Sequence, residues 1–105
     1  MKYLLLLCAD DTTPQVDITA ECEKWSADLG DKWVTAMGLH PPASATTIRV
    51  HEGEVLLTDG PFAETKEQMG GLSIIECDSP EEANRIAATH PWARIGMIEV
   101  RQLLG

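Results

Sequence analysis

The 105-residue sequence is short of basic residues. Eight Lys and Arg stand against seventeen Asp and Glu, which gives a formal net charge of -9. An acidic surface repels phosphate backbones and anionic lipid, so we expect neither nucleic acid nor a membrane as a partner.

The sequence also lacks a long apolar run, since no stretch approaches the ~20 apolar residues of a transmembrane helix. The apolar start, residues 3–9, ends at Asp10 and Asp11 without a small-residue cleavage pattern. We therefore predict a buried first strand and a cytoplasmic protein, not a signal peptide.

Cysteine is scarce, and its spacing excludes the common metal and redox motifs. The sequence has three cysteines, an odd number, and no two of them have CxxC spacing: Cys8, Cys22 and Cys77. Each lies in an apolar pattern, which favours a small core residue over a reactive thiol. The sequence contains neither an HxxxH pair nor a phosphate-binding glycine loop, so we predict no metal and no cofactor.

The first helix is predicted by one apolar stripe. Its members are Ile18, Cys22, Trp25, Leu29 and Trp33, at spacings of four, three, four and four. This period is that of an amphipathic helix, in which Gly30 marks a kink or an early end. Residues 33–39 are therefore ambiguous: they fit either the last helical turn or an extended segment.

The rest of the chain alternates in the manner of strands, with one further helix. Residues 46–51 and 55–58 predict a β-hairpin that turns at Glu52 and Gly53. Another strand follows over residues 72–77, and a last one over residues 96–104. Between them, Ser79, Pro80 and Glu82 form a strong helix start, and Pro91 prevents continuation of that helix.

This element order, β-α-(hairpin)-β-α-β, predicts a single α+β domain over residues 1–105. It matches a ferredoxin-like βαββαβ-type sandwich, with two helices on one face of an antiparallel sheet. The other face of so small a sheet needs a cover, and a second copy of the chain would supply it.

Asp59 is the candidate catalytic residue. One interpretation is a structural turn, in which its carboxylate caps backbone N–H groups while Gly60 takes an unusual φ. The other is a carboxylate at a strand end, aimed into a cleft as an acid, a base or a ligand anchor. Thr65, Lys66 and Glu67 follow and are candidate ligand-binding residues, although a solvated, salt-bridged loop is the better explanation for the glutamate.

The three histidines are not equally good candidates for ligand binding. His40 precedes two prolines in a loop, so we include it among the candidate ligand-binding residues. His51 alternates outward on the hairpin, and we expect it to be exposed. His90 ends a helix, where the dipole favours a protonated imidazole. Gly70 and Gly71 let the backbone approach either a ligand or a partner subunit.

Three segments in this order resemble the YCII-related family, specifically its DGPF branch: "LHPPASATTIRV", "VLLTDGPFAETKEQMGG" and "ARIGMIEVR". The least typical part is "GDKWVTAM", residues 30–37. The resemblance implies a homodimeric α/β-barrel with a ferredoxin-like subunit. It also implies a protein without an assigned reaction, in a branch often linked to extracytoplasmic-function sigma factors, while the wider family includes a dechlorinating enzyme.

YCII-type relatives carry a His–Asp pair, with the histidine on the first helix, but residues 12–37 contain no histidine. A purely structural hypothesis treats the DGPF segment as a rigid turn that helps to form the dimer. Two further hypotheses assign a function. One is a cofactor-independent lyase- or isomerase-like enzyme that acts on a small organic substrate, with Asp59 as acid or base. The other is a non-catalytic module that binds a small ligand or a protein in sigma-factor regulation.

Overall fold

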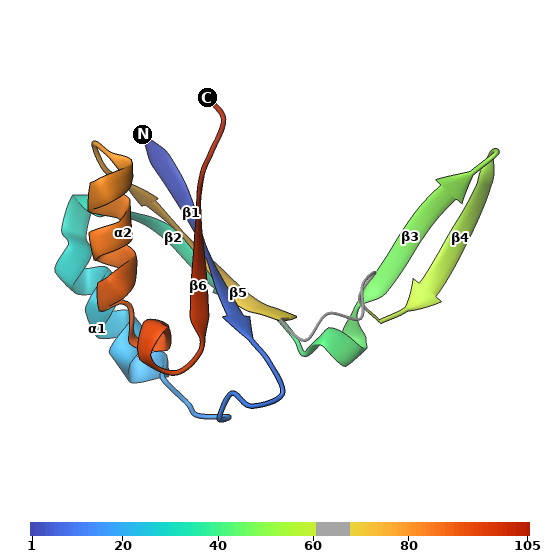
Figure 1. Cartoon of the computed structure of the whole chain (residues 1–105), viewed down its shortest axis with the longest axis horizontal. Coiled ribbons are helices and arrows are strands. Elements are labelled where there is room, and N and C mark those ends of the chain that lie inside the picture. Colours follow the sequence, from blue (N-terminus) through green and yellow to red (C-terminus); the bar gives the residue numbers. More distant parts are fainter. Residues whose placement is uncertain (61–67) are drawn as a thin grey trace.

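The computed structural model describes residues 1–60 and 68–105 (Figure 1). In chain order the strands and α-helices are β1 (Lys2–Ala9), α1 (Thr19–Leu29), β2 (Trp33–Gly38), β3 (Thr46–His51), β4 (Glu54–Asp59), β5 (Gln68–Glu76), α2 (Pro80–Thr89) and β6 (Met97–Gln102). Short 3-10 turns follow α1, precede β3 and follow α2. None of the helices in these two ranges is long and apolar enough to span a bilayer.

Four strands form an antiparallel sheet in the order β2-β5-β1-β6. Both helices lie on the same face of this sheet (Figure 1). Strands from both halves of the chain are interleaved, since β1 lies between β5 and β6. The predicted α+β class, with two helices on one face of an antiparallel sheet, is confirmed.

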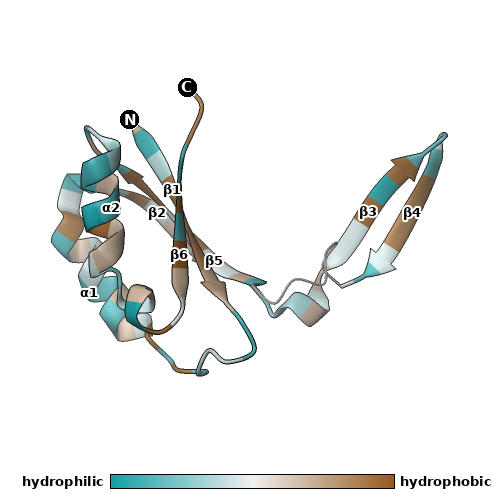
Figure 2. Cartoon of the chain, in the orientation of Figure 1, coloured by the Kyte–Doolittle hydropathy of each residue, from teal (hydrophilic) through white to brown (hydrophobic). Residues whose placement is uncertain are grey.

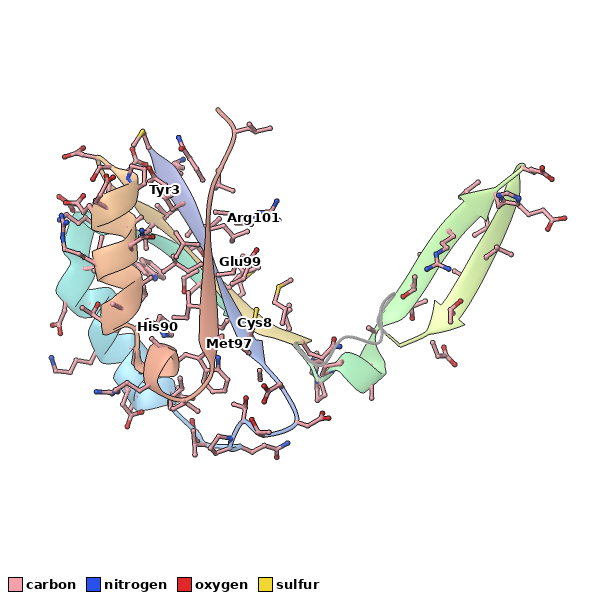
Figure 3. The ribbon with its side chains drawn as sticks, in the orientation of Figure 1. Tyr3, Cys8, His90, Met97, Glu99 and Arg101 are labelled. Atoms are coloured by element: carbon pink, nitrogen blue, oxygen red, sulfur yellow. The ribbon has the colours of Figure 1, made fainter. Side chains whose placement is uncertain are left out.

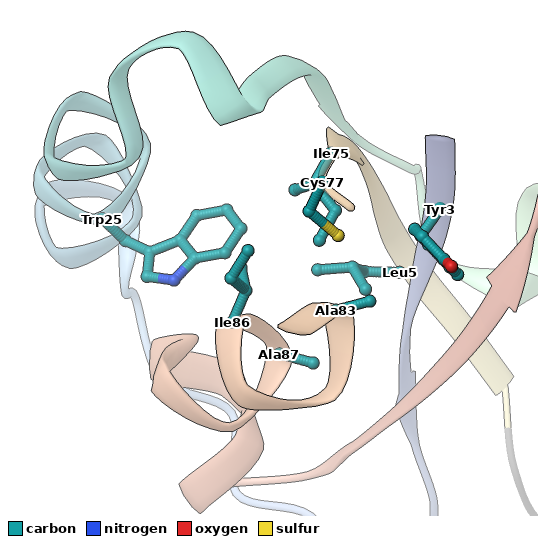
Figure 4. Packing of buried hydrophobic residues seen from close by; sticks show 8 residues of the cluster. All are labelled: Tyr3, Leu5, Trp25, Ile75, Cys77, Ala83, Ile86 and Ala87. Atoms are coloured by element: carbon teal, nitrogen blue, oxygen red, sulfur yellow. The ribbon is translucent and has the colours of Figure 1, made fainter. Parts of the chain in front are cut away.

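The hydrophobic core lies between this sheet and the two helices (Figure 4). Its buried residues come from β1, α1, β5, the turn after β5, and α2: Tyr3, Leu5, Trp25, Ile75, Cys77, Ala83, Ile86 and Ala87. The predicted core position of Cys77 is therefore confirmed.

The prediction that β1 is fully buried holds for one face only. Tyr3 and Leu5 point to the helices and are 2% and 0% exposed. Leu4 and Leu6 alternate with them and are half-buried on the other face. They lie beside Ile74 and Leu72 of β5, and no helix covers them (Figure 1). We call this side of the sheet the open face.

The end of α1 corrects the predicted stripe. The helix stops at Leu29, where Gly30 adopts a positive φ of 58°. One 3-10 turn later, Trp33 is the first residue of β2, not a member of the helix. Glycine reaches positive φ without the Cβ penalty, so Gly30 ends the helix instead of bending it. The ambiguous residues 33–39 are thus mostly extended.

The start of α2 agrees with the prediction. The Ser79 hydroxyl accepts a hydrogen bond from the Glu82 backbone N–H at 3.1 Å. The Glu82 carboxylate in turn accepts from the Asp78 N–H, also at 3.1 Å. These bonds satisfy backbone donors that the first helical turn leaves without partners.

Strands β3 and β4 form a separate two-stranded sheet that projects from the rest of the chain (Figures 1 and 2). We call it the arm, residues 46–59. Its turn has positive φ at both Glu52 (49°) and Gly53 (81°), as a type I′ hairpin requires. The predicted hairpin and its turn are confirmed.

Candidate functional site

Of the predicted site residues, the structure describes Asp59 and His40. Thr65, Lys66 and Glu67 fall outside the described residues, as do Pro61 and Phe62. Asp59 ends β4 opposite Thr46 and is exposed. Gly60 takes the unusual φ predicted for it, 93°.

Backbone groups at Gly60 hold this turn in place. Its N–H donates to the Ala45 carbonyl at 2.7 Å, and its carbonyl accepts from the Thr47 hydroxyl at 2.8 Å. His40 lies in the loop after β2 and is exposed, and His51 is exposed as predicted. Within the described ranges, no hydrogen bond or ion pair joins His40 to Asp59.

A cavity of about 520 Å³ lies elsewhere, between α1, β2, β5 and the 3-10 turn after α2 (Pro91–Arg94). Apolar groups make up most of its wall. The lining residues on which the argument depends are Asp17, Cys22, Glu23, Trp25, His90 and Trp92. Neither Asp59 nor His40 lines it.

His90 lies in the cavity wall and is only 2% exposed. Its Nδ1 accepts a hydrogen bond from the Trp92 backbone N–H at 2.9 Å. Its ring meets Trp25 edge-on, with centroids 4.5 Å apart. Burial lowers the pKa of His90 to about 4, so the imidazole is neutral near pH 7. The prediction of a protonated, dipole-stabilised His90 is therefore wrong.

Two of the three tryptophans that line the cavity, Trp25 and Trp92, are anchored by their indole N–H groups. Trp92 donates to the Cys8 carbonyl at 2.8 Å, and Trp25 donates to the Thr89 hydroxyl at 3.0 Å. Gly96 allows the first contact, because a Cβ there would lie 2.5 Å from both the Cys8 oxygen and Trp92 Nε1. The cavity wall is thus preformed.

Gly71 also permits a close approach, but the neighbour belongs to the same chain. A Cβ on Gly71 would lie 3.0 Å from the Met37 carbonyl of β2. The nearest atom to such a Cβ on Gly70 is the Leu7 carbonyl, at 4.0 Å. The close approach predicted for this pair is therefore explained by strand packing within the chain.

The polar groups of the cavity limit its chemistry. The Asp17 carboxylate accepts from the Thr19 hydroxyl at 2.7 Å, and this bond lowers the pKa of Asp17. Burial raises the pKa of the Cys22 thiol, which disfavours a thiolate nucleophile. Residues 1–60 and 68–105 contain no cluster of three or more His, Cys, Asp or Glu side chains that could hold a metal ion.

Sequence reasoning did not find this cavity. It assigned Trp25 to the core and His90 to a solvated helix end. The only local signal was His90 next to Pro91 and Trp92, just after an amphipathic helix. Burial of the imidazole depends on α1 packing across the end of α2, and no local pattern encodes that contact.

These features define an α+β domain with a ligand-sized apolar cavity beside its sheet. The chain belongs to the YCII-related family: the YCII-related domain matches residues 1–104. It is similar to an uncharacterized protein of Rhizobium meliloti (strain 1021), with 38% identity over 98% of this chain and 92% of the relative.

Proposed function

We propose that this chain is a homodimeric small-molecule-binding domain whose ligand occupies the cavity between α1, β2 and β5. The observation that carries the proposal is the buried, neutral His90 in the cavity wall. Its Nδ1 is already bonded to the Trp92 N–H, so the Nε2–H is the polar group that the ring can offer to a ligand in the cavity. The cavity of about 520 Å³ is also within the usual size of ligand sites.

The wall indicates the chemistry of the ligand. Since Nδ1 of His90 accepts from the Trp92 N–H, the proton of the neutral imidazole is on Nε2. The ring therefore offers one donor and no positive charge. Asp17 and Glu23 also line the cavity and disfavour an anion. We expect a small, mainly apolar, neutral molecule with a carbonyl or similar acceptor oxygen.

A test of the site needs a probe and a cavity-filling variant. Neutral carbonyl-bearing compounds would be screened by saturation-transfer NMR against the wild-type protein. Cys22→Phe fills the cavity, whereas Ala20→Phe adds the same ring to α1 at an exposed position outside it. Binding should be lost in Cys22→Phe and kept in Ala20→Phe. Equal binding to both variants would place the ligand elsewhere and contradict the proposal.

The role of His90 has its own test. His90→Phe keeps a ring in the wall and removes the donor. A net hydrogen bond contributes about 1 kcal/mol, so affinity should fall by up to about tenfold. An unchanged dissociation constant would mean that the ligand does not use the imidazole.

The proposed assembly is the dimeric α/β-barrel of the DGPF branch, with a ferredoxin-like subunit. Two observations support it. The strand order β2-β5-β1-β6, with both helices on one face, is that of a ferredoxin-like sandwich. The open face is apolar at Leu4, Leu6, Leu72 and Ile74, and sheet-on-sheet packing would cover it. Light scattering coupled to size exclusion tests this, and a monomer at all concentrations would contradict it.

A lyase- or isomerase-like reaction with Asp59 as acid or base is a second candidate. It is favoured by one observation: within the described residues, no group donates a hydrogen bond to the Asp59 carboxylate, so these residues do not use it as a turn cap. His40, Thr65, Lys66 and Glu67 would then bind the substrate around it. Asp59→Asn should abolish turnover of a compound that binds beside Asp59, outside the cavity, while the binding of that compound persists. Absence of turnover by the wild-type protein would exclude this candidate for that compound.

A further inference from the structure

We infer that the arm is an interaction surface for a second copy of this chain. The pairing of β3 with β4 gives the arm two different faces. Ile48 pairs with Leu57, and Val50 pairs with Val55, so these four side chains share one face. They are 63%, 67%, 68% and 63% exposed, respectively. We call them the apolar face of the arm.

The opposite face of the arm is mostly polar. Thr47 lies opposite Thr58, and His51 lies opposite Glu54. Arg49 pairs with Leu56, the only aliphatic residue on this side. Such alternation is typical of an antiparallel pair with one face in water and one face packed. The packing partner of the apolar face is absent from the described part of the chain, since the arm stands away from the body (Figure 2).

The arm needs a cover that is present whenever the protein is folded. A two-stranded hairpin by itself is at best marginally stable in water. Within residues 1–60 and 68–105, neither edge of the arm has a neighbouring strand. The radius of gyration is 15.6 Å, against the ~13 Å expected for a compact chain of this length. The projecting arm therefore makes the chain more extended than a compact domain of the same length.

A second copy fits this requirement better than an unrelated partner. It is available wherever the chain is made, and two-fold symmetry lets each arm contact the other subunit in the same way. The same chain also carries an apolar open face, rimmed by Met97, Glu99 and Arg101 (Figure 3). The four side chains that define the apolar face, Ile48, Val50, Val55 and Leu57, carry no charge, which disfavours a strongly charged partner.

This inference rests on the proposed homodimer, but it assigns a contact to a surface outside the four-stranded sheet. The chain offers a matched pair of variants to separate the two. Leu57→Lys places a charge on the apolar face of the arm. Leu56→Lys makes the same change at the adjacent residue, on the opposite face. Met97→Lys places the charge on the open face instead.

Sedimentation equilibrium would measure the dimer dissociation constant of each variant, with circular dichroism to check folding. Leu57→Lys should raise the constant at least about tenfold, because it buries an unpaired charge in the interface. Leu56→Lys should change it by no more than about twofold, as surface substitutions do. The inference would be overturned if Leu57→Lys had the same dimer dissociation constant as the wild-type protein while Met97→Lys associated more weakly. The proposed homodimer would then stand without the arm contact. A monomeric wild-type protein would overturn both.

Hydrogen exchange of the wild-type protein avoids any risk that a variant misfolds. Backbone amides of β3 and β4 should become more protected as the protein concentration is raised, in proportion to the fraction of dimer. Amides of β1 and β5 belong to the main sheet and act as the internal reference. Arm amides that exchange freely in the dimer would overturn the inference, whatever the outcome of the ligand tests.

Discussion

Tyr3 has a buried hydroxyl without a hydrogen-bond partner among the described residues. Burial raises the pKa of this phenol, and the nearby Cys77 and Glu81 raise it further. The residue keeps its ring in the core, while its polar end gains nothing from the fold. An unpaired buried polar group costs about 1–3 kcal/mol.

Replacing this hydroxyl should therefore stabilise the protein. We predict that Tyr3→Phe raises the free energy of unfolding by about 1 kcal/mol, because the ring packing is kept and the desolvation cost is removed. Urea denaturation monitored by circular dichroism measures the change. A loss of more than about 1 kcal/mol would show that the hydroxyl has a partner in the assembled protein.

His90 makes stability depend on pH. Its pKa is about 4 in the folded protein and about 6.5 in an unfolded chain. Between these values the unfolded state binds more protons, so stability rises with pH. The contribution of the neutral imidazole is complete above about pH 6.5, and it is lost as the pH falls towards 4.

We predict that His90→Phe removes this dependence between about pH 4 and 6.5. The wild-type protein should lose up to about 3 kcal/mol across the window, since each pKa unit corresponds to about 1.4 kcal/mol. Denaturant titrations at several pH values measure both slopes. Asp10 and Asp17 have lowered pKa values because of hydrogen bonds from Thr12 and Thr19, so their contributions are lost mainly below this window. If stability changed equally with pH in the wild-type protein and in His90→Phe, His90 would not be the cause of the dependence.

In the candidate site, some residue properties were predictable from the local sequence and others were not. The exposed position of His51 and the positive φ of Gly60 followed from local patterns. The state of His90 did not, because its neutrality depends on Trp25 from a distant helix and on burial by both helices. The assignment of Asp59 to a reaction is still a prediction.

At the scale of elements, the cap of α2 is a well-defined contributor to stability. We predict that Ser79→Ala lowers the free energy of unfolding by about 1 kcal/mol, because the Glu82 N–H loses its acceptor. Ser26→Ala is the control within α1, where its hydroxyl donates to the Glu23 carbonyl and alanine is the better helix former. Thermal denaturation compares the two. A larger loss for Ser26→Ala would contradict this account of the cap.

Element boundaries were predictable where a residue imposes a backbone conformation. Gly30, Gly53 and Pro91 mark an end or a turn through their own φ values or missing N–H group. The assignment of Trp33 was not predictable from spacing, because it continues the helical stripe past Gly30. Pairing with β5 places it in β2, and such pairing is a tertiary contact.

At the scale of the whole molecule, stability should depend on protein concentration. If the open face and the arm are covered only in a dimer, association stabilises the folded state by mass action. We predict that a tenfold increase in concentration raises the melting temperature by roughly 3 °C. Differential scanning calorimetry over a dilution series measures this. A melting temperature independent of concentration would indicate a subunit that is stable alone.

The sequence by itself determined the local features: the strand and helix periods, the capped start of α2 at Ser79, and the hairpin turn at Glu52 and Gly53. Each depends on residues within a few positions of one another. The tertiary structure alone decided which face of the sheet the helices cover and where the cavity lies. It also decided that His90 is neutral. These properties depend on segments far apart in the chain, whose packing no local period encodes.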